Sequence, residues 1–418
     1  MFQKGKILVV VFSAVIIVYG AAAAFYERVA ATDETLPAIT VFMDTLRTIH
    51  RDYVEAPDMN KVQEGAMRGM IDALDPYSTY LTKGQIQALD SAKNLAGDVG
   101  LVLSKRASIL YVVSVQRNRP AAKAGMRPGD YLVSVDGTNV EDKSILEAEA
   151  MLRGAPGSKV KAEVFRGTAI KPVELEMVRD VDTPAVVGSR MMDGRIGLIE
   201  VSSLANPTLE QVRLKIKTLI SAGAEKLILD LRDCADGTPA DGANLANLFL
   251  KGGSIYSTRG RDGRIIEEAK AVPEKFLTDL PLAVLVNSST AGPAEITAGA
   301  LKAGGRGIVV GEKSFGVGSA QTRIQLQSGS VLLLSTAKYY TPDGKVIEND
   351  ETFRDTGIKP NIEVPDQDRL QDLLVNAYFD AQDDAGKYMQ LRDKVNQEQL
   401  EKAIEALAKG AAAQKRVE

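Results

Sequence analysis

The second half of the chain alternates short apolar runs with amphipathic stretches. Mostly apolar runs of strand length occupy residues 196–201, 227–231, 282–286, 307–311 and 331–335, of which only the run at 282–286 is continuous. Between the first two runs, Leu209, Val212, Ile216 and Leu219 recur at helical spacing. Strands that alternate with helices form largely parallel sheets covered on their faces. Residues 182–365 are therefore predicted to form an α/β domain.

The first half contains a helical stretch followed by a β-rich one. Ile39, Phe42, Leu46 and Ile49 repeat at helical spacing, so residues 31–95 are predicted to form a small helical module. Strand-like runs then cover residues 97–104, 110–115, 131–135, 159–165 and 173–177. Residues 96–181 are predicted to form a β-rich domain, and the polar residues 366–418 a helical tail.

The first 30 residues carry a long uncharged segment. It begins at Ile7 and ends at Phe25, which is about the 20 residues needed to span a bilayer. Lys4 and Lys6 precede it and predict that the bulk of the chain lies outside the cytoplasm, on the periplasmic side in a cell with two membranes. We expect residues 1–30 to form an uncleaved N-terminal transmembrane helix that anchors the chain in the cell membrane. The alanines at 21–24 also resemble a signal-peptidase site, which leaves cleavage open.

Composition and charge narrow the classes of function. The net charge is −4 over 418 residues, so no basic field favours binding of nucleic acid. His50 is the single histidine and Cys234 the single cysteine, which excludes an intrachain disulfide and disfavours a metal centre. No cofactor and no metal are expected. A Ser-His-Asp triad would have to use His50, which is far in the sequence from any motif.

The stretch from Leu282 to Gln321 is where catalytic chemistry is expected. An apolar strand at residues 282–286 leads through a tight turn into a helix that begins at Pro293. Such a turn commonly mounts a nucleophile, because the start of a helix favours negative charge. Here the tip of the turn is Gly292, which carries no nucleophile.

The β-rich domain resembles a PDZ domain. The resemblance rests on four ordered blocks, Gly97-Asp-Val-Gly-Leu-Val102, Pro120-Ala-Ala-Lys-Ala-Gly125, Gly129-Asp130 and Val135-Asp-Gly137. It implies a groove between a strand and a helix that adds a peptide as an extra strand. The loop formed by Val99, Gly100, Leu101 and Val102 would hold the terminal carboxylate of the peptide on its backbone N–H groups. A β-rich domain without a ligand is the alternative.

The chain from about Ala38 to Pro365 resembles the carboxyl-terminal processing peptidases. Its core blocks include Leu229-Asp-Leu-Arg232, Ala294-Glu-Ile296, Gly311-Glu-Lys-Ser-Phe-Gly316, Ala337-Lys-Tyr-Tyr-Thr-Pro342 and Gly357-Ile-Lys-Pro-Asn361. The resemblance implies an α/β core like the Clp protease and crotonase folds. It also implies hydrolysis of peptide bonds by a serine–lysine dyad, in which the lysine accepts the serine proton and backbone N–H groups stabilise the oxyanion.

Carried onto this sequence, the family's catalytic positions lack their chemistry. The serine falls on Gly292 and the lysine on Val317, while a glutamine that supports the lysine is retained as Gln321. The residue after the nucleophile is Pro293, which has no N–H to give to the oxyanion. The family's Asn-Pro-Gly-Gly loop reads Cys234-Ala-Asp-Gly237. It thus places Asp236, beside Gly237, where the developing oxyanion needs positive potential.

Three hypotheses follow from this pattern. The first is a catalytically degenerate, membrane-anchored member that binds polypeptide C-termini, unfolded protein or a partner such as an active paralogue. The second is a working serine-type endopeptidase that cleaves near protein C-termini with a displaced dyad. Its components would come from Ser288, Ser289 or Thr290 together with Lys313. The third is a structural protein without a ligand, which the intact PDZ loop disfavours.

Overall fold

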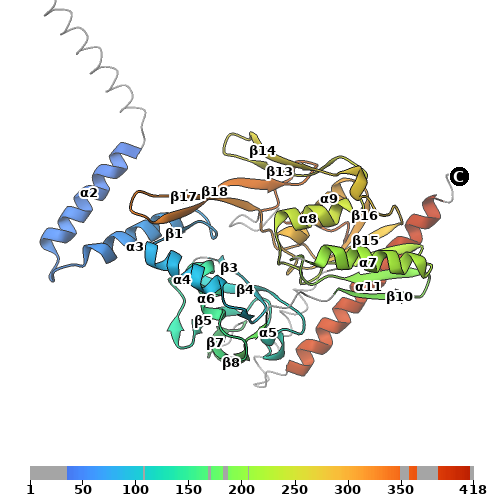
Figure 1. Ribbon diagram of the computed structural model, residues 1–418, viewed down its shortest axis with the longest axis horizontal. Helices are drawn as coiled ribbons and strands as arrows, with labels where there is room; N and C mark the ends of the chain where they lie inside the picture. Colours follow the sequence, from blue (N-terminus) through green and yellow to red (C-terminus); the bar gives the residue numbers. More distant parts are fainter. Residues whose placement is uncertain are drawn as a thin grey trace, which may run out of the picture. The chain divides into compact units, whose positions relative to one another are not determined.

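The computed structural model describes residues 35–106, 109–167, 171–181, 187–205, 207–348, 357–364 and 385–414. The chain separates into two compact units, residues 1–69 and 70–418, which are described separately (Figure 1). The segment from Ile7 to Phe25, predicted to span a membrane, lies outside the described residues. Among the residues that are described, no helix is both long enough and apolar enough to cross a bilayer.

The first unit is helical, as its periodicity predicts. Helix α2 spans Thr35–Asp52, and helix α3, Met59–Asp72, begins in this unit. Several large apolar side chains of α2 are exposed, among them Ile39 and Val41.

The β-rich domain is built on a sheet with the strand order β3-β4-β5-β7-β8, to which β6 adds beside β5. Its strands are β2 (Gly97–Asp98), β3 (Leu101–Arg106), β4 (Ile109–Val115), β5 (Tyr131–Val135), β6 (Thr138–Asn139), β7 (Lys159–Phe165), β8 (Val173–Val178) and β9 (Asp180–Val181). Its helices are α5 (Pro120–Lys123) and α6 (Ile145–Leu152), and α4 (Lys83–Lys93) packs against α6. The predicted single strand over 97–104 is wrong. Gly100 has φ +80°, which breaks the run into β2 and β3.

The α/β core is a six-stranded sheet with the order β10-β11-β12-β15-β16-β19. Its members are β10 (Gly188–Met192), β11 (Ile196–Glu200), β12 (Lys226–Asp230), β15 (Leu282–Val286), β16 (Gly307–Gly311) and β19 (Ile362–Glu363). From β11 to β19 the strands are parallel, and β10 joins the edge antiparallel. The α/β prediction is therefore confirmed.

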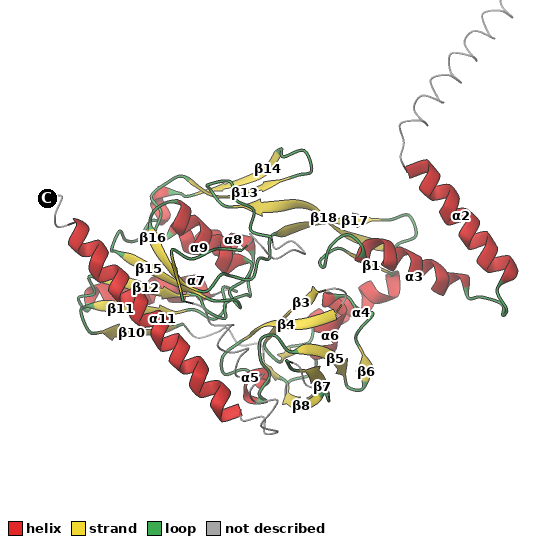
Figure 2. Cartoon of the chain, turned by 180° about the vertical axis from the view of Figure 1, so that it is seen from behind, coloured by secondary structure: helices red, strands yellow, loops and turns green. Residues whose placement is uncertain are grey.

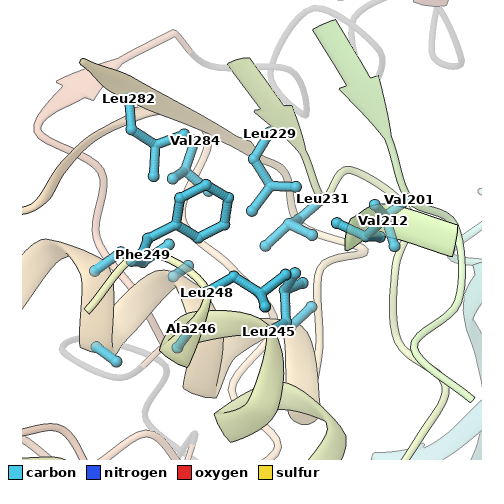
Figure 3. Close-up of a cluster of buried hydrophobic side chains, with 14 of the residues drawn as sticks. Val201, Val212, Leu229, Leu231, Leu245, Ala246, Leu248, Phe249, Leu282 and Val284 are labelled. Atoms are coloured by element: carbon cyan, nitrogen blue, oxygen red, sulfur yellow. The ribbon is translucent and has the colours of Figure 1, made fainter. Parts of the chain in front are cut away.

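Side chains that alternate along these strands supply two apolar layers. Leu229 and Val284 face the helices α7 (Thr208–Ser221), α8 (Pro239–Asn247) and α9 (Pro293–Ala303), where Phe249 fills the centre of the layer (Figure 3). Ile228 and Leu285 point to the opposite face, which α11 (Ala385–Gln414) covers (Figure 2). The sequence predicts a polar helical tail here, but Leu400, Ala403 and Leu407 of α11 are buried against the sheet.

A second sheet has the order β1-β18-β13-β14, with β17 paired to β18. It consists of β1 (Thr79–Leu81), β13 (Ser254–Arg259), β14 (Ile265–Lys270), β17 (Ser319–Gln325) and β18 (Val331–Tyr340), and the turn η1 (Pro273–Lys275) follows β14. Strand β18 runs five residues beyond residue 335, where the apolar pattern predicts its end. The same pattern does not predict β17. Most residues of β17 are polar and exposed, so it lacks the apolar pattern from which a strand is recognised.

Buried charges hold α11 to the loop that follows β12. The Arg232 guanidinium donates to both carboxylate oxygens of Asp230 and also reaches Asn396 and Gln399 on α11. Arg392 of the same helix pairs with Asp233. Because the next residues along this loop are 234–237, α11 helps to fix the loop that borders the candidate site.

Candidate active site

The turn between β15 and α9 is fixed by the side chain of Asn287. Its Oδ1 accepts from the Asp233 and Ser289 N–H groups, and its Nδ2 donates to Asp233 Oδ1 at 2.9 Å. The Thr290 hydroxyl oxygen accepts from Asn287 N–H. Since these groups are all buried, the turn and the loop after β12 form one hydrogen-bonded unit.

Gly292 is the N-cap of α9 and has an unusual backbone conformation. Its φ is +53° and its ψ is −113°, a combination that costs other L-residues about 1–2 kcal/mol. Space itself is not limiting, because a Cβ built on Gly292 would meet only Ala235 O, at 3.9 Å. The backbone therefore presents an open direction for a side chain at the tip of the turn, and this chain has none there.

The Glu295 carboxylate brings the two family dyad positions together. Its Oε2 accepts from Gly292 N–H at 2.9 Å and from Val317 N–H at 2.8 Å. Its Oε1 accepts from Gly316 N–H and from the Ser314 hydroxyl. Gly292 and Val317 thus share one hydrogen-bond acceptor, as expected if residues at these positions work as a pair in relatives.

Burial dominates the ionisation of Glu295. The side chain is fully buried, and this desolvation raises its pKa to about 7, against an ordinary value near 4.5. The hydrogen bonds from Ser314, Val317, Gly292 and Gly316 act in the opposite direction and favour the charged form. Four N–H and O–H donors surround the carboxylate and compensate its charge.

The loop expected to complete an oxyanion hole carries a negatively charged side chain. Asp236 Oδ2 accepts from the Ser203 hydroxyl at 2.8 Å and from Gln116 Nε2 at 3.3 Å. Gly237 follows with φ +120°. Pro293 is buried at the first position of α9 and contributes no N–H. The position after Gly292 therefore supplies no N–H donor, and the neighbouring loop carries a carboxyl group.

Gln321 lies at the start of β17, and its side chain faces serines. Its Nε2 donates to Ser319 O and Oγ and to Ser335 Oγ. Ser335 in turn donates to Asp75, which also accepts from the backbone and hydroxyl of Ser78. Gln321 thus belongs to a polar network with the turn that precedes β1.

The hydroxyls near the tip are committed to structural contacts or buried. Thr290 Oγ1 donates to Leu231 O, and Ser289 is 3% exposed. The Ser314 hydroxyl donates to Glu295 and accepts from Ile358 N–H. Ser288 and Lys313 are half-buried. The hydroxyls of Thr290 and Ser314 therefore serve structural hydrogen bonds.

Strand β4 of the PDZ-like domain packs on the loops of the site. The Ser114 hydroxyl donates to Asp233 O at 2.6 Å, and Arg117 forms ion pairs with Glu200 and Asp233. The Tyr111 ring lies 5.8 Å from that of Phe315, in the loop that leads to Val317. The domain and the candidate site are therefore in direct contact.

The predicted peptide-binding loop lies at the start of β3. Val99 is buried, Gly100 has the left-handed conformation, and Leu101 and Val102 are half-buried at the start of the strand.

Sequence reasoning missed two carboxylates that act beside the predicted sites. In the sequence, Glu295 stands out only as a member of the family block Ala294-Glu-Ile296. A glutamate three residues after a helix cap is nevertheless typical of a capping box. Asp98 carried no such signal.

The conformation of Gly292 predicts a cost for any side chain there. We expect Gly292→Ala to lower the free energy of unfolding by about 1–2 kcal/mol, because φ +53° is strained for alanine. Gly84→Ala in helix α4 is the control, since a Cβ there meets nothing within 4 Å and its φ is not positive. It should change stability by no more than about 1 kcal/mol, in the stabilising direction. Urea unfolding compares the two, and equal stability of Gly292→Ala and wild type would contradict the assigned conformation.

Burial of Glu295 predicts a pH dependence of stability. Its folded pKa of about 7 lies above its ordinary value near 4.5, so the folded state binds the proton more tightly. This contribution is complete below the unfolded pKa and is lost as the pH rises through 7. The free energy of unfolding should fall by up to about 3 kcal/mol between pH 4.5 and 8 because of this group.

The test compares wild type with Glu295→Gln by urea unfolding at several pH values. The variant should be less stable at low pH but lose less stability as the pH rises. Glu149, whose pKa burial also raises to about 7, contributes in both proteins, so the difference in slope isolates Glu295. Parallel pH profiles would rule out a raised pKa at Glu295.

Comparison with known proteins gives a consistent result. Residues 195–364 match the model of peptidase family S41, residues 97–177 that of a PDZ domain, and residues 21–84 the N-terminal domain of the activating protease CtpB. The chain is 35% identical over 327 residues to the carboxy-terminal processing protease CtpA of Bacillus subtilis (strain 168), covering 77% of this chain and 68% of that protein.

Two further relatives agree. The carboxy-terminal-processing protease of Bartonella bacilliformis is 32% identical over 335 residues, which cover 79% of this chain and 76% of that protein. The solved photosystem II D1 C-terminal processing protease superposes with a TM-score of 0.64 at 26% identity, covering 80% of this chain and 96% of that one. The S41 peptidase core, the PDZ domain and these identities show that the chain belongs to peptidase family S41, among the carboxy-terminal processing proteases.

Proposed function

We propose that this chain is a pseudopeptidase of the carboxy-terminal processing protease family, which binds polypeptides without cleaving them. The observation that carries the proposal is Gly292. Its backbone offers an open direction for a side chain at the tip of the turn, close to Val317, and neither residue has a group that can attack or accept a proton.

Two other features support the loss of activity. Pro293 provides no N–H after the nucleophile position, and Asp236 places a carboxylate in the neighbouring loop. Glu295 remains, but it binds backbone N–H groups and so keeps the frame of the site without supplying catalysis. Removing one oxyanion donor costs about a hundredfold to a thousandfold in rate, so these defects add to the missing dyad.

The proposed activity is polypeptide binding in the groove beside β3 of the PDZ domain. The loop Val99, Gly100, Leu101 and Val102 is the anchoring point, and polypeptide C-termini are the ligands that the family resemblance implies. Because β4 of the same domain contacts the loops of the empty site, a bound polypeptide lies beside the former catalytic cleft. A partner such as an active paralogue is a second class of ligand for these surfaces.

The proposed location is the cell membrane, with the domains outside the cytoplasm. The uncharged run from Ile7 to Phe25 and the preceding Lys4 and Lys6 support this part of the proposal.

A serine-type endopeptidase with a displaced dyad is the competing function. It would use Ser288 or Ser289 with Lys313, but Ser289 is almost fully buried and the hydroxyl of Thr290 is bound to Leu231 O. A misplacement of about 1 Å can cost a hundredfold in rate, so a nucleophile three or four residues before the tip is disfavoured.

The test follows cleavage of a defined unfolded protein. The full chain is incubated with reduced, carboxymethylated α-lactalbumin, and products are followed by intact mass spectrometry, with the Bacillus subtilis relative as positive control. We expect no products from this chain. Cleavage that disappears in Ser289→Ala or Lys313→Ala would establish the displaced dyad instead.

Restoring the dyad alone should not restore a protease. Gly292→Ser with Val317→Lys returns the two side chains but leaves Pro293 and Asp236 in place, so we expect turnover close to background. Adding Pro293→Ala and Asp236→Gly should raise the rate at least about a hundredfold over the double variant. Robust turnover in the double variant would show that the oxyanion defects matter little, and circular dichroism checks that all variants fold.

A further inference from the structure

Asp98 immediately precedes the loop that would anchor a peptide in the PDZ domain. Its Oδ1 accepts from Gly100 N–H at 2.6 Å, and Gly100 is the central residue of the loop Val99, Gly100 and Leu101. The carboxylate also lies 3.5 Å from a guanidinium nitrogen of Arg153 and 3.9 Å from one of Arg119.

The hydrogen bond from Gly100 N–H is of the kind that a bound chain end would accept. In PDZ recognition a terminal carboxylate accepts hydrogen bonds from the backbone N–H groups of this loop. Asp98 supplies a carboxylate to the Gly100 N–H from within the chain, and the side chain is largely buried, at 19% exposure. An incoming carboxylate would lose one of its donors and would meet a negative charge at short range.

The surroundings add further negative charge. Asp98 and Asp236 both help to raise the pKa of Glu149 on α6, after the larger effect of its burial, whereas Arg153 lowers it. Asp236 is bound to Gln116 of the segment that follows β4. The loop therefore lies near three carboxylates and near the guanidinium groups of Arg119 and Arg153, both of which form ion pairs with Asp98.

The rest of the groove keeps features that an extended segment needs. Strand β3 is the edge of its sheet in the part of the chain that the structure describes, so one row of its backbone groups has no partner strand. At the other end of β3, a small pocket is lined by Lys105, by Ser144 to Leu146 at the start of α6, and by residues from the turn before β1.

We propose that Asp98 acts as an internal carboxylate ligand of the loop, so that the PDZ groove selects polypeptide segments that have no terminal carboxylate there. Such segments are internal stretches of a chain added as a strand along β3. This inference rests on the proposed polypeptide binding and replaces chain ends with internal segments as the ligands of the groove.

The test uses the full chain and one pool of fluorescent octapeptides, random at seven positions and ending in valine, leucine or alanine. The pool is prepared as free acids, as C-terminal amides, and with a Gly-Ser-Gly-Ser extension after the eighth residue. Fluorescence anisotropy gives the apparent affinity of each form. Wild type should bind the amides and the extended peptides at least as tightly as the free acids. A tenfold preference of wild type for the free acids would overturn the inference while supporting polypeptide binding.

Two variants separate the effect of an occupied Gly100 N–H from the effect of the negative charge of Asp98. Asp98→Gly frees the Gly100 N–H and should shift the preference toward free acids by about tenfold or more. Asp98→Asn removes the charge but keeps an acceptor for that N–H, so it should shift the preference less. Asp136→Asn, at an exposed turn of the same domain, is the control and should leave the preference unchanged. An unchanged preference in a folded Asp98→Gly protein would also overturn the inference. Failure of every form to bind wild type and both Asp98 variants would instead refute the proposed polypeptide binding itself.

Discussion

The buried carboxylate of Glu295 is the interaction on which the site depends. It joins the start of α9 to the loop at residues 314–317, two segments that belong to different strand connections. A buried carboxylate is costly unless donors surround it, and here four N–H or O–H groups do so. The same bonds that offset its burial hold Gly292 and Val317 beside each other. The frame of the active site can therefore persist after its catalytic side chains are gone.

The two places where this family resemblance implies a bound anion both carry an aspartate. Asp236 lies in the loop expected to stabilise an oxyanion, and Asp98 lies at the loop expected to hold a peptide carboxylate. Each aspartate accepts hydrogen bonds from neighbouring groups of the chain, which hold its carboxyl group in place. Both aspartates fit the proposed pseudopeptidase, which keeps the fold of a protease without the electrostatics that cleavage and recognition of chain ends require.

Much of the fold follows from patterns in the sequence. The apolar runs of β11, β12, β15 and β16 identify the parallel sheet because both of its faces are covered and its strands are almost entirely apolar. The pattern fails for β17, whose side chains face solvent. It also hides the role of α11, whose buried residues recur at helical spacing but include two alanines and Gln399 in a mostly polar helix.

The candidate site is only partly readable from sequence. Ordered motifs locate Gly292 and Val317, but they do not show that one carboxylate oxygen binds both backbones. The hydrogen bond from Gly100 to Asp98 was equally hidden, since an aspartate that binds the backbone two residues on is common in turns and marks no function. Both depend on the direction of a side chain, which periodicity and spacing do not determine.

The central claim is that the backbone around Gly292 and Val317 keeps the arrangement of a catalytic site, whereas the catalytic side chains are missing. It is tested most directly by incubating the full chain with a serine-reactive covalent reagent that labels the Bacillus subtilis relative, and measuring the intact mass. The account predicts no adduct on this chain under conditions in which the relative is fully labelled. A stoichiometric adduct that peptide mapping places on Ser288, Ser289 or Thr290 would contradict it.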